Sequence, residues 1–296
     1  MDQLRLRGVE NAVALARSLG VNCDHPVVLA DSSHLVVHLA PTRVVAHVAT
    51  TMALVRPDLL PGLARELEVA AFLKHQGAPV APPSSEIDPG PHVFDGYAIT
   101  FWEQVTHDAS SAVSLNEALP LLRELHGALE SYPGQLPYLI PVLEKIPRWL
   151  RYLQVNRGLL AMDMMMLREA HWRLAETLSM PQTRSQPLHG NAHIRHLLRT
   201  PAGLLWNGFE DVCRGPLAWD VVSLGWGARA ESPASGVETV LKAYDAPSNG
   251  WSWEALAPYI DARELQGVVW LQVLALRFPE HRQRANQLLE AWRQKA

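Results

Sequence analysis

Residues Pro187–Asp220 read PLHGNAHIRHLLRTPAGLLWNGFEDVCRGPLAWD, and this stretch decides the fold. It contains three histidines, a glycine that favours a tight turn, a predicted hairpin and an acidic cluster. Strongly helical patterns precede and follow it. Such a density of polar groups between helical regions predicts a functional site.

The composition is that of a globular protein. Of the 296 residues, 48% are hydrophobic and 19% are charged, which is enough apolar surface for one large domain or two lobes. The net charge of −4 and the scattered basic residues argue against a nucleic-acid partner. We therefore expect a folded protein that does not bind nucleic acid.

Targeting and redox signals are weak. Cys23 and Cys213 have neither the spacing of a metal site nor the number needed for a disulfide framework. No apolar run is long enough to cross a bilayer, and Met1–Gly20 contains charges that a signal peptide lacks. The sequence predicts a cytoplasmic protein without a membrane partner.

The first hundred residues predict a small β-rich lobe. A helical pattern ends at Gly20, and short β-branched runs between Pro26 and Thr50 predict a three-stranded antiparallel meander. Leu63–Lys74 predicts a helix, and the proline-rich stretch Ala81–Gly96 predicts a loop. Tyr97–Val105 alternates as a strand and ends the predicted lobe of residues 1–105.

The remainder is predicted to be a larger helical lobe, residues 106–296, which contains the segment 187–220. The expected helices are Leu115–Glu130, Leu139–Gln154, Leu159–Leu178, Val221–Ala228, Gly236–Ala246, Trp251–Leu276 and Pro279–Lys295. His196–Arg199 and Gly203–Trp206 predict a hairpin between them. The predicted fold class is therefore α+β.

Four short motifs resemble the signature of the aminoglycoside phosphotransferase family. They are His189-Gly190-Asn191-Ala192-His193, Phe209-Glu210-Asp211, Gly215-Pro216 and Trp219-Asp220, which are similar to the HGDxHxxN, DFE and GPxxWD patterns. The resemblance implies a two-lobed protein-kinase-like fold with a small antiparallel sheet. It also implies phosphorylation of small-molecule hydroxyls with Mg-ATP, and a structural role for Gly215, Trp219 and Asp220, with Asp220 accepting backbone hydrogen bonds near His189.

Other segments extend this resemblance. Val44–Val48 resembles the strand that carries the ATP lysine, with His47 at the lysine position and Glu66 as its partner. Tyr97–Val105 resembles the hinge, in which Trp102, Glu103 and Val105 are the nucleotide-contacting candidates. Leu122–Leu129 resembles a helix of the C-terminal lobe.

Four positions that the resemblance assigns to chemistry are substituted. Asn191 stands at the position of the base, and an amide cannot take up a proton, although it can still orient a hydroxyl. His196 and Gly208 stand at the two metal positions, but Mg²⁺ prefers oxygen ligands. His47 carries no fixed charge, although Glu66 nearby can favour its protonation; the other interpretation is an ordinary strand histidine.

Two alternatives concern metals. Glu210 or Asp211 can replace the missing magnesium carboxylate, but simple loss of the metal site is the preferred interpretation. His189, His193 and His196 are spaced as transition-metal ligands on a helix, yet Gly190 argues against a helix and favours ordinary loop histidines.

Three functions follow. The preferred one is a catalytically impaired pseudo-phosphotransferase that binds a small molecule or a protein, with His189, Asn191 and His193 in the former catalytic loop and with neither ATP nor Mg²⁺ assured. The second is an active ATP-dependent phosphotransferase with a rearranged site. The third is a dimeric interaction scaffold with a filled cleft, in which tryptophans such as Trp251, Trp253 and Trp270 serve an interface, although core packing is the preferred interpretation for most of them. The sequence leaves the oligomeric state open.

Overall fold

The computed structural model describes residues 3–56, 58–108, 110–179, 184–231, 240, 244 and 251–295. The chain divides into two compact units. Unit 1 consists of Met1–Ala109 and Leu198–Glu210, and unit 2 consists of Ser110–Leu197 and Asp211–Ala296.

Unit 1 is built on a five-stranded antiparallel sheet with the order β1-β2-β3-β5-β4. The strands are β1 (His25–Asp31), β2 (His34–Ala40), β3 (Val44–Ala49), β4 (His92–Phe94) and β5 (Tyr97–Glu103). Alternation explains the buried face, because Leu35, Val37 and Leu39 of β2 are fully buried while the residues between them are half-buried.

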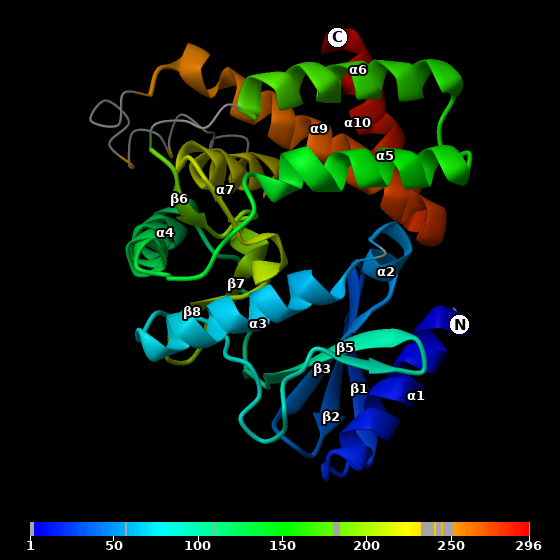
Figure 1. Ribbon diagram of the computed structural model, residues 1–296, viewed down its shortest axis with the longest axis vertical. Helices are drawn as coiled ribbons and strands as arrows, with labels where there is room; N and C mark the ends of the chain where they lie inside the picture. The colour runs from blue at the N-terminus through cyan, green and yellow to red at the C-terminus, as the bar shows by residue number, and fades with distance from the viewer. Residues whose placement is uncertain are drawn as a thin grey trace. The chain divides into compact units, whose positions relative to one another are not determined.

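One helix packs against several strands of this sheet. α1 (Gln3–Ser18) packs Ala12, Leu15 and Ala16 into the same apolar cluster as the strands (Figure 1). The other helices are α2 (Thr51–Val55) and α3 (Leu60–His75). A second hairpin, β7 (Leu197–Thr200) with β8 (Gly203–Trp206), joins unit 1 because Trp206 exchanges backbone hydrogen bonds with Pro79 and Ala81.

Unit 2 is mainly helical. Its helices are α4 (Leu115–Glu130), a π-helical turn (Pro141–Lys145), α5 (Ile146–Val155), α6 (Ala161–Leu178), α7 (Ala218–Glu231), α9 (Trp253–Arg277) and α10 (Arg282–Lys295). Short 3₁₀ turns occur at Ile194–His196, Phe209–Asp211 and Pro279–His281. α9 packs against α5, α6, α7 and α10 and forms the centre of the bundle (Figure 1).

A two-stranded ribbon, β6 (Gln186–Leu188) with β9 (Cys213–Gly215), carries the polar segment of unit 2. It brings the two ends of the segment 187–220 together in antiparallel register, with Leu188 opposite Cys213. The pairing of β6 with β9 closes the chain between Leu188 and Cys213 into a loop, from which the β7–β8 hairpin projects, and α7 begins shortly after β9.

The α+β class predicted from sequence is confirmed, and most elements lie where the patterns placed them. Several details differ, and α2, β6 and β9 correspond to no predicted element. β4 lies inside the proline-rich stretch predicted as a loop, because a three-residue strand shows no periodicity. The two units divide after Ala109, and unit 1 includes Leu198–Glu210; the predicted lobes of residues 1–105 and 106–296 stay a prediction. The predicted helix Gly236–Ala246 lies largely outside the described residues.

The helices in the described ranges include none that combines the length and the apolar character of a membrane span.

Candidate functional site

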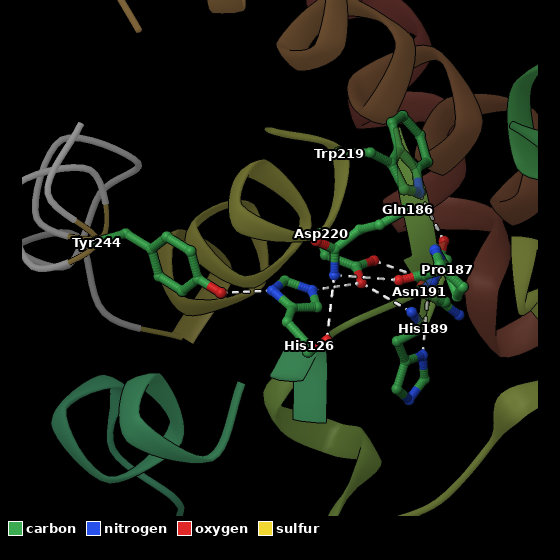
Figure 2. A network of polar contacts seen from close by, with 9 residues as sticks. His126, Gln186, Pro187, His189, Asn191, Trp219, Asp220 and Tyr244 are labelled. Atoms are coloured by element: carbon green, nitrogen blue, oxygen red, sulfur yellow. Dashed lines mark hydrogen bonds and ion pairs between the residues drawn. The ribbon is translucent and has the colours of Figure 1, made fainter. Parts of the chain in front are cut away.

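Asp220, in the first turn of α7, organises the polar segment of unit 2 (Figure 2). Its carboxylate is fully buried and accepts hydrogen bonds from the backbone N–H groups of His189, at 2.8 Å, and Gly190, at 2.9 Å. The indole Nε1 of Trp219 donates to the carbonyl oxygen of Gly190 at 2.7 Å. These contacts agree with the expectation that Asp220 accepts bonds from the loop around His189.

His126 and Tyr244 complete this network (Figure 2). Nε2 of His126 lies 3.0 Å from the Asp220 carboxylate, and its Nδ1 bonds to the Tyr244 hydroxyl. Burial raises the pKa of Tyr244, and the charge of Asp220 raises it further, so the phenol stays protonated and donates to Nδ1. His126 therefore donates through Nε2 to the carboxylate.

Gly190 forms the tight turn at which the loop approaches the backbone of Asp211. Its φ is +79°, and a Cβ placed on it would lie 1.8 Å from the carbonyl oxygen of Asp211. Any side chain there would displace one of the two backbones, because carbon and oxygen do not approach so closely. The structure thus brings the residue before Asn191 directly against Asp211.

Asn191 is held at both ends of its amide. Its Oδ1 accepts from Nη2 of Arg263 at 2.8 Å, and its Nδ2 lies 3.1 Å from Nε2 of His196. Because the amide nitrogen can only donate, Nε2 of His196 is the acceptor and carries no proton. The position that the resemblance assigns to the base therefore holds an amide whose oxygen accepts a hydrogen bond from the guanidinium of Arg263.

Arg263 enters the loop from α9. Burial lowers the pKa of its guanidinium to about 10, while the carboxylates of Asp211 and Asp220 act in the opposite direction, so the group remains charged at neutral pH. It also donates to Gln266 and stacks over the indole of Trp226, 5.5 Å from the ring centre. The only sequence signal for this residue is an arginine within an apolar helical pattern.

The three loop histidines do not form a metal site. Nδ1 of His189 accepts from the backbone N–H of Asn191 and Nδ1 of His193 from that of Arg195. Burial, reinforced by nearby positive charge, lowers the pKa of His193 to about 2, so it stays neutral. Across the described part of the chain, no group of three or more His, Cys, Asp or Glu residues is arranged to hold a metal ion.

Asp211, one of the two carboxylates considered for magnesium, forms a buried ion pair. Nζ of Lys145 lies 2.5 Å from its Oδ1, and the two side chains are only 4% and 1% exposed. Lys145 comes from the π-helical turn, and no motif in the sequence indicates this pairing. Asp211 is thus already neutralised by a residue of the chain.

In unit 1, Glu210 and Gly208 follow the hairpin. The Glu210 carboxylate lies 3.5 Å from Nδ1 of His34, at the start of β2. Gly208 has a φ of +72° and no side chain to offer a metal. Glu210 is therefore directed toward a histidine of the sheet.

His47 lies on β3 beside two rings. Its ring stacks on Trp102, with centres 5.4 Å apart, and lies 6.4 Å from the ring of His34. Burial lowers the pKa of His47 to about 3, so it is neutral at physiological pH. Glu66, the residue predicted to pair with His47, is buried on α3, and the pairing of the two stays a prediction. The strand-histidine interpretation fits this position.

The predicted hinge residues make their own internal contacts. Trp102 donates from Nε1 to Thr100 at 2.9 Å, and the backbone N–H of Glu103 donates to the carbonyl oxygen of Pro82. The carbonyl oxygen of Val105 bonds to Nδ1 of His107 at 2.8 Å.

The residues present do not fit a magnesium ion within either unit. In unit 2 the candidate ligands are an amide held by Arg263, a histidine nitrogen and a carboxylate paired with Lys145. Mg²⁺ prefers free carboxylate and water oxygens in octahedral geometry. In unit 1 the metal position is Gly208, and Glu210 faces His34.

A model described as the phosphotransferase enzyme family matches residues 30–259. A search of curated proteins finds no match. Among solved structures, the amicoumacin kinase hAmiN in complex with AMP-PNP, Ca²⁺ and Ami is similar with a TM-score of 0.71 and 12% identity, covering 100% of this chain and 97% of that one.

Two further structures give the same result. The microcompartment-associated aminopropanol kinase has a TM-score of 0.62 and 16% identity, covering 93% of each chain. The aminoglycoside-3'-phosphotransferase of type VIII has a TM-score of 0.61 and 18% identity, covering 89% of this chain and 100% of that one. These similarities confirm the predicted kinase-like fold.

Proposed function

The chain belongs to the phosphotransferase enzyme family, and we propose that it is a member that has lost phosphoryl transfer and acts by binding a ligand or partner. The observation that carries this proposal is the environment of Asn191. Its amide oxygen accepts from the buried cation Arg263, and its amide nitrogen faces an unprotonated nitrogen of His196. Neither amide atom is available to remove a proton from a hydroxyl.

The loss of a general base slows catalysis by about two to four orders of magnitude. Phosphoryl transfer also depends on metal ions and on a cation at the nucleotide phosphates. His196, Gly208 and the neutral His47 supply neither. Because the deficits affect separate parts of the chemistry, a single compensating residue does not restore the reaction.

The framework around these substitutions is intact, which favours a retained binding role. Asp220 and Trp219 still fix the loop, and Gly190 still allows its close approach to Asp211. We propose ligand binding ahead of the scaffold function, because the loop keeps a fixed conformation although the positions assigned to chemistry are substituted.

The test combines binding and turnover on the full chain. Thermal unfolding is followed with ATP alone, with Mg²⁺ alone and with both, and ATP consumption is measured with a panel of small hydroxyl compounds. We expect no Mg²⁺-dependent shift and no acceptor-dependent consumption. A Mg²⁺-dependent ATP shift together with turnover would establish the active alternative and refute the proposal.

A reversion variant sharpens this test. Asn191→Asp, His196→Asn, Gly208→Asp and His47→Lys together restore the family residues. If the substitutions caused the loss, the combined variant gains Mg²⁺-dependent ATP binding that the parent lacks. The matched control, Asn156→Asp at an exposed position, changes charge without touching these positions and should behave as the parent.

A further inference from the structure

A pocket of about 260 Å³ lies in unit 2 between α7, α9 and α10, away from the contacts of Asp220. Trp226, Val268, Leu288 and Trp292 supply most of its apolar wall. A site lined by aromatic and aliphatic groups with a few charged groups is typical of small-molecule recognition.

The size of the pocket limits its ligand. A dry cavity of about 150 Å³ is sufficient for benzene, whereas drug-sized ligands occupy roughly 300 to 1,000 Å³. A pocket of about 260 Å³ therefore fits one ring with a short substituent.

The charged residues around the pocket favour a ligand whose substituent is negatively charged. Lys295 is already paired with Glu264, at 2.6 Å, and with Asp261, at 2.5 Å. Arg284 lines the pocket, is exposed, and has no hydrogen-bond or ion-pair partner within the described residues. An anion can therefore pair with Arg284 without displacing an existing partner.

The surroundings of the two indoles disfavour a cationic ligand. An aromatic wall beside a carboxylate can attract a cationic ligand. Here each indole already has a cation from the chain: Arg263 lies 5.5 Å from the ring centre of Trp226, and Lys295 lies 5.4 Å from that of Trp292. A cationic ligand would meet these charges and Arg284 as well.

We propose that this pocket binds a small monocyclic aromatic carboxylate, with its ring against Trp226 and Trp292 and its carboxylate on Arg284. Trp226 also stacks on Arg263, which donates to Asn191. Arg263 therefore links the pocket residue Trp226 to Asn191, although neither the pocket nor its ligand depends on whether phosphoryl transfer is lost.

The experiment titrates the full chain with benzoate, benzylamine and benzyl alcohol, which share one ring and differ in charge. The readout is the ¹⁵N–¹H spectrum of the ten tryptophan indoles, assigned by single substitutions. We expect benzoate to shift the signals of Trp226 and Trp292 with a Kd of about 1 mM or tighter. Trp172, which is 63% exposed on α6, is the internal reference and should not move.

Variants separate this site from non-specific binding. Arg284→Gln should weaken benzoate about tenfold through loss of the charged hydrogen bond, and Ala291→Trp, at the exposed rim, should fill the pocket and abolish binding. Arg282→Gln on the same helix is the charge-matched control and should bind as the parent. The proposal is overturned by the lack of any shift at 10 mM benzoate, by equal binding of benzylamine, or by unchanged affinity in the Arg284 variant.

Discussion

Burial, and not distance, should decide the strength of the Lys145–Asp211 ion pair. Its N···O distance of 2.5 Å is shared by the Arg173–Glu169 pair on α6, but the exposures are 4% and 1% in the first pair and 69% and 61% in the second. Removing one partner of a buried pair leaves an uncompensated charge and costs about 3 to 5 kcal/mol. Removing one partner of an exposed helical pair costs about 0.5 kcal/mol or less.

We expect Lys145→Met to lower the free energy of unfolding of unit 2 by about 3 to 5 kcal/mol, because Asp211 retains its charge in the interior. Adding Asp211→Asn removes that charge and should restore at least about 2 kcal/mol. Arg173→Met should change stability by no more than about 0.5 kcal/mol.

Amide hydrogen exchange in α9, the central helix of unit 2, measures these changes. The reasoning is refuted if the two buried substitutions are additive. It is equally refuted if Lys145→Met is as mild as Arg173→Met.

Two further predictions concern the loop. Gly190→Ala should destabilise unit 2 by about 4 kcal/mol or more, because the new Cβ would lie 1.8 Å from the Asp211 carbonyl oxygen. The control Gly77→Ala, at a similar φ of +77° with open space around it, should cost only about 1 to 2 kcal/mol. Equal melting temperatures of the two variants would contradict the clash. The pKa of His193 is about 2 in the folded chain, against an ordinary value of 6.5. Between these two pH values the unfolded chain binds a proton at this residue that the folded chain does not bind. Protonation of His193 in the unfolded chain therefore lowers the stability of the fold as the pH falls below 6.5. Between pH 6 and 4, His193→Gln should reduce the slope of the unfolding free energy against pH by the equivalent of about one bound proton. Denaturant titrations over this pH range measure the slope, and the same slope in both proteins would refute the prediction.

Periodicity was sufficient for most of the fold. The alternation in β2 and the three- and four-residue spacing in α4 reflect surfaces that are buried on one side, so the sequence carries their pattern directly. The capping box of Ser114 and Glu117 also fixes the start of α4 locally. Short elements such as β4, β6 and β9 are different, because three residues show no period and their pairing depends on distant strands.

The site was predictable only where a motif defines it. Asp220 and Gly190 lie within the motif-bearing segment Pro187–Asp220, and the hydrogen bond between them depends on the turn at Gly190. Lys145, Arg263 and Tyr244 reach the segment from elements far along the chain. The side-chain directions of Lys145 and Arg263 depend on how their helical elements pack, which no local pattern encodes.

These distant residues change how the electrostatics of the segment are understood. Asp211 and Asp220 contribute two buried negative charges to unit 2, and Lys145 and Arg263 contribute two positive charges, so this set sums to zero. Buried charges are tolerated when they are paired and hydrogen-bonded, and this set is balanced by the chain alone. A divalent cation among these four residues would add two uncompensated charges or would have to displace Lys145 or Arg263. Restoring a carboxylate by Asn191→Asp would likewise place it against a guanidinium that lies 2.8 Å away, so that substitution alone should leave the new carboxylate ion-paired and a poor base.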